Sequence, residues 1–211
     1  MIIFGCDQKD YPHIDVRLFD FRNFVYLAFD YLNLGEPTPL QMDMAYWMQF
    51  GPKRLQAQAF RGIGKSILAE VFCAWALYVI YSDQERARPE FAILSLSAAG
   101  ARAQSCSTFV FNLIMGWDML AHLRPDPNGR CSKINFDVGP APVQDSPSMR
   151  ALGITGQMAG ARSNLTVMDD VEVPNNSATQ MRREALVETV KEVDALIKPL
   201  PEDEELARVY P

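Results

Sequence analysis

The sequence has few of the residues that hold metal ions or cross-link small secreted proteins. It contains two histidines, His13 and His122, and four cysteines that stand far apart with no CxxC pair. A structural zinc site is therefore not expected, and four isolated thiols are typical of a reducing cytosol. The amino-terminus has no basic segment ahead of an apolar stretch, which argues against a signal peptide.

Long hydrophobic runs and net positive charge are also missing. The longest apolar run, residues 67–81, contains Glu70 and is shorter than the roughly 20 residues that span a bilayer. It predicts a buried helix, and we expect no membrane partner. Acidic residues outnumber basic residues by 26 to 20, which gives a net charge of -6. Because non-specific DNA affinity comes mainly from cationic contacts, a passive nucleic-acid coat is disfavoured, but a local basic patch or a ring of subunits around DNA remains open.

The sequence does contain enough apolar material for one core, because 48% of its residues are hydrophobic and 22% are charged. Helices are expected at residues 15–32, 38–48, 65–81, 98–113 and 177–197, and strands at 55–60, 91–96, 133–138, 149–154, 165–168 and 205–210. Strands that alternate with helices predict an α/β fold with a parallel sheet. We expect a helical N-terminal extension over residues 1–50 and one α/β domain over residues 51–211.

A glycine-rich turn between a predicted strand and a predicted apolar helix is the strongest local signal. A phosphate-binding loop needs glycines that aim backbone N–H groups at phosphates, a lysine for the β and γ phosphates, and a hydroxyl for Mg2+. Gly62, Gly64, Lys65 and Ser66 match this pattern, and Ala59 stands where the motif has its first glycine. The residues that we predict to bind ATP in this loop are Ala59, Arg61, Gly62, Gly64, Lys65 and Ser66, and Ser66 is also expected to bind Mg2+. The alternative is an ordinary strand–helix turn.

Arg61 lies inside the same loop. Its guanidinium could stabilise charge on the γ-phosphate of a nucleotide bound to its own chain. The alternative is a solvated surface arginine.

A second signal is the apolar strand at residues 165–168, which ends in carboxylates. A carboxylate at the carboxyl end of a parallel strand lies in the crevice where such sheets bind ligands. We expect Asp169 to organise Mg2+, as in a Walker B site. Either Asp170 or Glu172 would polarise the attacking water, and Asp170 is slightly favoured because it directly follows the metal ligand. Clustered carboxylates on their own are equally typical of a solvated turn.

Residues 37–41 give a third and weaker signal. The amide of Gln41 can give and take hydrogen bonds with the edge of adenine, as in the Q motif of helicase-like motors. Helix capping explains Thr38 and Pro39 without any nucleotide, so both interpretations stay open.

Together these motifs resemble the large terminase subunit of short-tailed, podovirus-type DNA phages. The resemblance covers about residues 37–199 and rests on segments 37–41, 58–66, 94–98, 135–140, 153–162, 169–172 and 176–179. It implies a RecA-like (ASCE) P-loop NTPase sheet, which forms the ATPase domain of a DNA-packaging motor. It also implies that Arg162 reaches the nucleotide of a neighbouring subunit as an arginine finger. The partners implied are double-stranded DNA, the small terminase subunit, the portal ring and further copies in a ring, in the host cytoplasm.

The sequence departs from that family at its carboxyl end. Family members continue into a coupling motif and an RNase H-like nuclease domain, and neither pattern occurs in residues 1–211. We therefore expect a truncated ATPase domain with no nuclease activity. Two other functions remain open, namely another P-loop NTPase such as a helicase core, and a nucleotide-binding module with little turnover.

Overall fold

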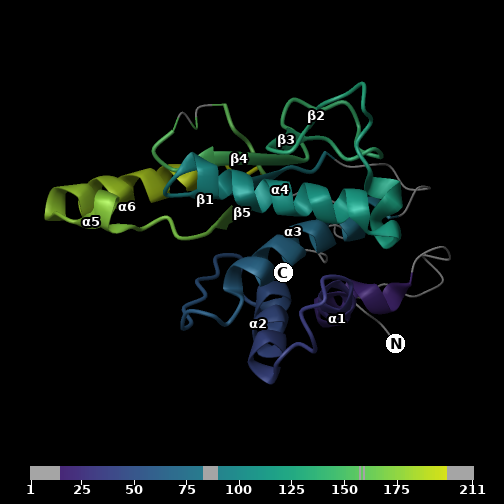
Figure 1. Ribbon diagram of the computed structural model, residues 1–211. Helices are drawn as coiled ribbons and strands as arrows, with labels where there is room; N and C mark the ends of the chain where they lie inside the picture. The colour runs from purple at the N-terminus through teal and green to yellow at the C-terminus, as the bar shows by residue number, and fades with distance from the viewer. Residues whose placement is uncertain (1–14, 83–89, 157, 159, 199–211) are drawn as a thin grey trace. The chain divides into compact units, whose positions relative to one another are not determined.

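The computed structural model describes residues 15–82, 90–156, 158 and 160–198 (Figure 1). The chain divides into two compact units, Met1–Ala87 with Leu200–Pro211, and Arg88–Pro199. The strand expected at residues 205–210 lies outside the described residues. The boundary expected at residue 50 stays a prediction. Among the described helices, none combines the length and the apolar character that a membrane crossing requires.

The described elements of the first unit are all helical. They are the 3-10 helix η2 (Val16–Phe19), α1 (Phe21–Tyr31), α2 (Pro39–Phe50) and α3 (Lys65–Tyr81). A single helix over residues 15–32 was expected, and the structure corrects this to two. The reason is Asp20, whose side chain accepts the backbone N–H of Arg22 and caps the start of α1 in an extended conformation.

Aromatic side chains of α1 and α3 form the core of the first unit. The ring of Phe21 lies 5.0 Å from that of Phe72 and 5.2 Å from that of Trp75. The indole N–H of Trp75 donates to the carbonyl of Leu18 at 2.8 Å, so its polar atom is satisfied inside the core. Phe24 is fully buried as well, and burial of such a side chain contributes about 1.5–3 kcal/mol to stability.

Residues 55–60 do not form the strand that we expected. All five strands of the described chain belong to the second unit, so this segment has no ladder partner within its own unit. Leu55 and Phe60 are 39% and 66% exposed, and an alternating pattern without a buried face does not hold a strand. The apolar alternation that suggested a strand was therefore misleading.

The second unit is a five-stranded sheet with helices. Its strands are β1 (Ile93–Ser97), β2 (Cys131–Ser132), β3 (Asn135–Phe136), β4 (Met149–Gly153) and β5 (Leu165–Met168), in the order β2-β3-β4-β1-β5. β1 pairs in parallel with both β4 and β5, which confirms the parallel sheet for these three strands. β3 pairs antiparallel with β2 and β4, so the sheet as a whole is mixed.

The helices of the second unit are α4 (Gly100–Gly116), the 3-10 helix η3 (Asp118–Leu123), α5 (Pro174–Ser177) and α6 (Gln180–Asp194). Figure 1 shows α4 running beside β1 and β4, which it contacts. Leu94 and Leu96 project from one face of β1 because side chains alternate along a strand. They pack with Met158, Ala161 and Val193 in a buried cluster.

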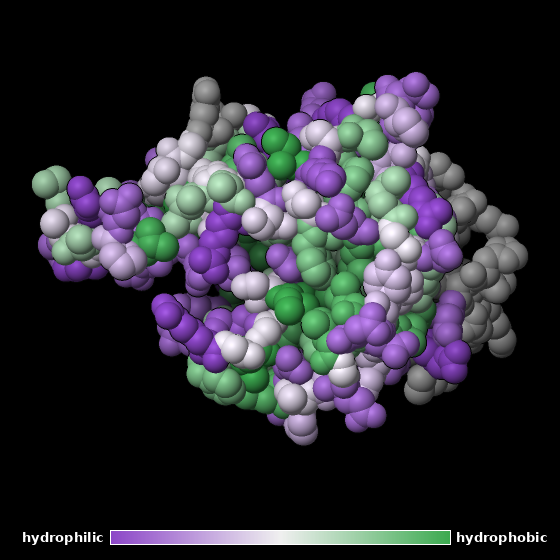
Figure 2. Space-filling model, in the orientation of Figure 1, coloured by the Kyte–Doolittle hydropathy of each residue, from purple (hydrophilic) through white to green (hydrophobic). Residues whose placement is uncertain are grey.

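α6 is exposed along most of its length, and its surface in Figure 2 is mainly hydrophilic. Its start is capped by Thr179, whose side chain accepts the backbone N–H of Arg182. The helix expected at residues 177–197 is therefore shorter in the structure, over residues 180–194. The α/β architecture expected from the sequence is present in the described chain, with a sheet that is parallel only at β4, β1 and β5.

Candidate functional site

The predicted phosphate loop leads directly into α3. Gly64 occupies the cap position before the first helical residue, Lys65, and as a glycine it makes no side-chain hydrogen bond to the helix start. Gly62 and Gly64 have φ angles of 90° and 86°, in the left-handed region that glycine adopts without strain. The backbone N–H groups of the loop therefore lie next to the start of a long helix, where the helix dipole favours binding of an anion.

Lys65 folds its side chain back over the loop. Its ammonium donates to the carbonyl of Ala59 at 2.6 Å and to that of Phe60 at 3.2 Å. These bonds join the first residue of α3 to the beginning of the loop, and the Lys65 residue that makes them is half-buried. A helix start preceded by a glycine, two left-handed glycines and a lysine held by neutral carbonyls form a donor set that fits a chain of phosphates.

Ala59 departs from the phosphate-loop pattern without backbone strain. It is not among the residues with positive φ, so the backbone at this position does not require glycine. What the loop uses at residue 59 is the carbonyl oxygen that accepts from Lys65, and any residue supplies a carbonyl.

The other loop residues are placed as follows. Arg61 is exposed and Ser66 is half-buried, both beside the start of α3. The amide of Gln41 lies against the same loop, because its Nε2 donates to the carbonyl of Ile63 at 2.8 Å. The first unit therefore brings together Gln41 and the loop residues that the sequence singled out.

The predicted carboxylates lie at the carboxyl end of β5, as expected. The backbone N–H of Asp169 donates to the carbonyl of Leu96 at 3.0 Å, and that of Ala98 donates to the carbonyl of Asp170 at 3.3 Å. The ends of β1 and β5 are thereby joined just past their last paired residues. Glu172 lies beyond them and is exposed. Among the described residues, no group of three or more Asp, Glu, His or Cys side chains is arranged to hold a metal.

Asp170 has two features that the sequence did not reveal. Its φ is 47°, and non-glycine residues with positive φ are uncommon and concentrate at functional sites. Its Oδ2 also forms an ion pair with Nη2 of Arg102 at 2.7 Å. Arg102 lies in the first turn of α4, which begins just after β1. The sequence carried one signal for this pair. Arg102 is a basic residue in the first turn of the helix that follows β1, and β1 is the neighbour of β5 in the sheet.

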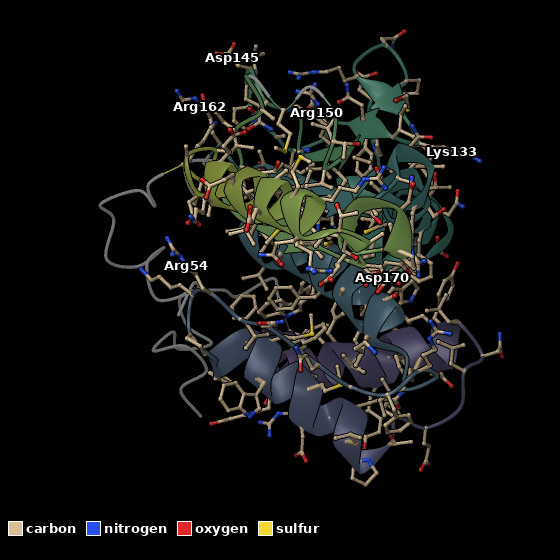
Figure 3. The ribbon with its side chains drawn as sticks, turned by 90° about the vertical axis from the view of Figure 1, so that its left-hand side faces the viewer. Arg54, Lys133, Asp145, Arg150, Arg162 and Asp170 are labelled. Carbon is tan, nitrogen blue, oxygen red and sulfur yellow. The ribbon has the colours of Figure 1, made fainter. Side chains whose placement is uncertain are left out.

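Arg162 lies away from these carboxylates. It precedes β5, whereas Asp170 follows it, so the two residues lie at opposite ends of the strand. Figure 3 shows Arg162 and Asp170 well separated within the second unit. Arg162 is exposed and follows Gly160, whose φ is 80°. The geometry therefore does not bring Arg162 to the carboxylates of its own chain.

Comparison with known proteins decides between the families that such motifs allow. No protein-family profile matches the chain. The chain is 44% identical over 183 residues to the terminase large subunit of Enterobacteria phage T3, a podovirus. The resemblance to phage terminase large subunits is confirmed. The aligned region covers 86% of this chain and 30% of the T3 terminase subunit, so the chain spans less than a third of that relative.

Proposed function

We propose that this chain is the ATP-binding and ATP-hydrolysing motor domain of a phage DNA-packaging terminase. It would be built on a RecA-like (ASCE) P-loop sheet with a helical N-terminal extension. The observation that carries this proposal is the loop at the start of α3, where Gly62 and Gly64 have left-handed φ angles and the Lys65 ammonium donates to the carbonyls of Ala59 and Phe60. The support from comparison is the identity of 44% to the T3 terminase large subunit.

The phosphate loop would hold the triphosphate. Lys65 exchanges the carbonyls of Ala59 and Phe60 for phosphate oxygens, and the backbone N–H groups at the start of α3 donate to the same anion. Mg2+ bound with ATP neutralises phosphate charge, and Ser66 and Asp169 are the residues that the sequence pattern assigns to it. Arg61 adds a cation beside the γ-phosphate from within the loop.

Hydrolysis needs a carboxylate that orients the attacking water. Asp170 is our first candidate and Glu172 the second, because Asp170 is fixed by the Arg102 ion pair and by the Ala98 hydrogen bond. Arg162, at the other end of β5, would act on the nucleotide of a neighbouring copy. Such an arrangement couples turnover to the packing of subunits in a ring.

The partners follow from the terminase relationship rather than from the geometry. We infer double-stranded DNA, the small terminase subunit and the portal ring as partners, and the host cytoplasm as the place of action. The relative is named a terminase large subunit, and this chain covers only part of its length.

Nucleotide binding and turnover, each measured with and without DNA, test the proposal and its alternatives. We expect calorimetric titration to detect ATP binding with Mg2+, and phosphate release to rise with double-stranded DNA. Stimulation by single-stranded DNA alone would favour a helicase core. Binding with negligible turnover under all conditions would favour a nucleotide-binding module.

A further inference from the structure

The side chain of Gln41 is almost fully engaged within the first unit. Its Oε1 accepts the backbone N–H of Thr38 at 2.8 Å and lies 3.1 Å from the Thr38 hydroxyl. Its backbone N–H donates to that hydroxyl at 3.3 Å, which completes a capping box at the start of α2. Its Nε2 donates to the carbonyl of Ile63 at 2.8 Å, 22 residues along the chain.

These bonds also fix which amide atom is oxygen and which is nitrogen. The N–H of Thr38 needs an acceptor and the carbonyl of Ile63 needs a donor, and only the observed orientation satisfies both. An adenine edge read by a glutamine takes one acceptor and one donor of the amide together. Here Oε1 already receives both available Thr38 donors, so reading adenine requires breaking the capping box.

The bond to Ile63 acts on the phosphate loop itself. Ile63 is buried between the two left-handed glycines, and its carbonyl is directed to Gln41. In a planar trans peptide the carbonyl and the following N–H point in opposite directions. Holding the Ile63 carbonyl therefore sets the direction of the Gly64 N–H, a backbone donor of the loop.

Gly64 confirms how close this contact is. A Cβ at Gly64 would lie 3.1 Å from Nε2 of Gln41, whereas a Cβ at Gly62 would meet nothing within 4 Å. The amide of Gln41 thus packs against the last residue before α3. It links the start of α2 to the start of α3.

We propose that Gln41 is a positioning residue that sets the Ile63–Gly64 peptide for phosphate binding and does not recognise adenine. The proposal rests on the proposed function, since it concerns the same triphosphate site. It predicts that Gln41 matters equally for every ligand with a triphosphate, whatever base is attached.

The test compares ATP, GTP and inorganic tripolyphosphate, each with Mg2+, by calorimetric titration of the whole chain. Gln41→Glu keeps an acceptor for the capping box and loses the donor to Ile63. Gln41→Met is its uncharged companion. Thr38→Ala is the matched control, because it removes the cap hydroxyl and leaves the Gln41 donor in place.

We expect both Gln41 variants to weaken binding of all three ligands by a similar factor, about 5- to 50-fold, because a loop carbonyl loses its partner and the peptide is released. Thr38→Ala should weaken binding less than about threefold. Hydrogen exchange without ligand should be faster at the Gly64 amide in both Gln41 variants and unchanged in the control.

The outcomes separate this inference from the proposed function. Loss of ATP affinity with unchanged GTP and tripolyphosphate affinity overturns the positioning role and restores adenine recognition. Unchanged binding of all three ligands, with unchanged exchange at Gly64, also overturns the positioning role. A parent chain that binds none of the three ligands overturns the proposed function itself.

Discussion

Arg102, in the first turn of α4, holds the carboxylate of Asp170 through an ion pair of 2.7 Å. Both side chains are more than half exposed, at 56% and 53%. Exposed pairs of this kind add little to stability, because water and salt screen them. The effect of the pair is therefore to orient Asp170, whose backbone already has a φ of 47°.

Removal of Arg102 should change turnover more than stability. We expect Arg102→Ala to lower kcat about 10-fold and to leave ATP affinity within about twofold. The reason is that Asp170, which we propose to orient the attacking water, loses its fixed direction. The melting temperature should stay within about 2 °C of the parent. Lys191→Ala is the control, since it removes another exposed ion pair of the second unit, with Glu188. Equal kcat in the parent and both variants would show that the Arg102 pair is only a surface contact.

Asp170→Asn and Glu172→Gln distinguish the two candidate carboxylates. Asparagine tolerates the left-handed backbone at residue 170, so this substitution removes the charge without adding strain. We expect Asp170→Asn to lower kcat at least about 100-fold while ATP still binds, and Glu172→Gln to keep most activity. The reverse pattern would assign the role to Glu172, and full activity in both variants contradicts the Walker B interpretation.

Two glycine substitutions separate backbone strain from contact with Gln41. Gly64→Ala and Gly35→Ala both force alanine into the left-handed region, at φ angles of 86° and 76°, and each should cost about 1–2 kcal/mol of stability. Only Gly64→Ala also presses on Nε2 of Gln41, from 3.1 Å. Urea unfolding should show similar losses, while only Gly64→Ala weakens ATP binding. Equal ATP affinity in both variants would argue against the Gln41 contact as part of the site.

Gln49 gives a test of the helical packing alone. Its buried amide accepts the N–H of Phe21 and donates to the carbonyl of Phe19, both at 2.8 Å. Gln49→Leu removes both of these buried hydrogen bonds, so we expect a loss of about 2–4 kcal/mol in the free energy of unfolding. Gln104→Leu, at an exposed position of α4, should change stability by less than about 0.5 kcal/mol. A similar result for the two variants would contradict the structural role of Gln49.

Helix bounds and helix caps could be predicted from the sequence where neighbouring residues determine them. The helix expected at residues 65–81 has these bounds in the structure, because Gly64 and an apolar run define it. The Thr38 cap was expected for the same reason, since all its partners lie within one turn. The segment at residues 55–60 was misjudged because a strand depends on a distant pairing partner.

The contacts of the candidate site divide in the same way. The Lys65 and Gly64 positions follow from a compact motif. The Arg102–Asp170 pair joins residues of different elements, and the bond from Gln41 to Ile63 joins α2 to the loop before α3. In both pairs the two residues stand far apart in the sequence, so the spacing of a local motif does not identify them. Both depend on how the elements pack, which the sequence pattern alone does not state.

The most direct test of the account is phosphate release from ATP and Mg2+ by the parent chain and by Lys65→Ala. Lys65 contributes a positive charge to the loop that defines the proposed site. Its loss should therefore lower both ATP affinity and turnover, by about 10-fold or more in each. Lys191→Ala, which changes an exposed lysine of α6, should match the parent. If Lys65→Ala binds and hydrolyses ATP as the parent does, the phosphate-loop assignment and the proposed motor function are wrong.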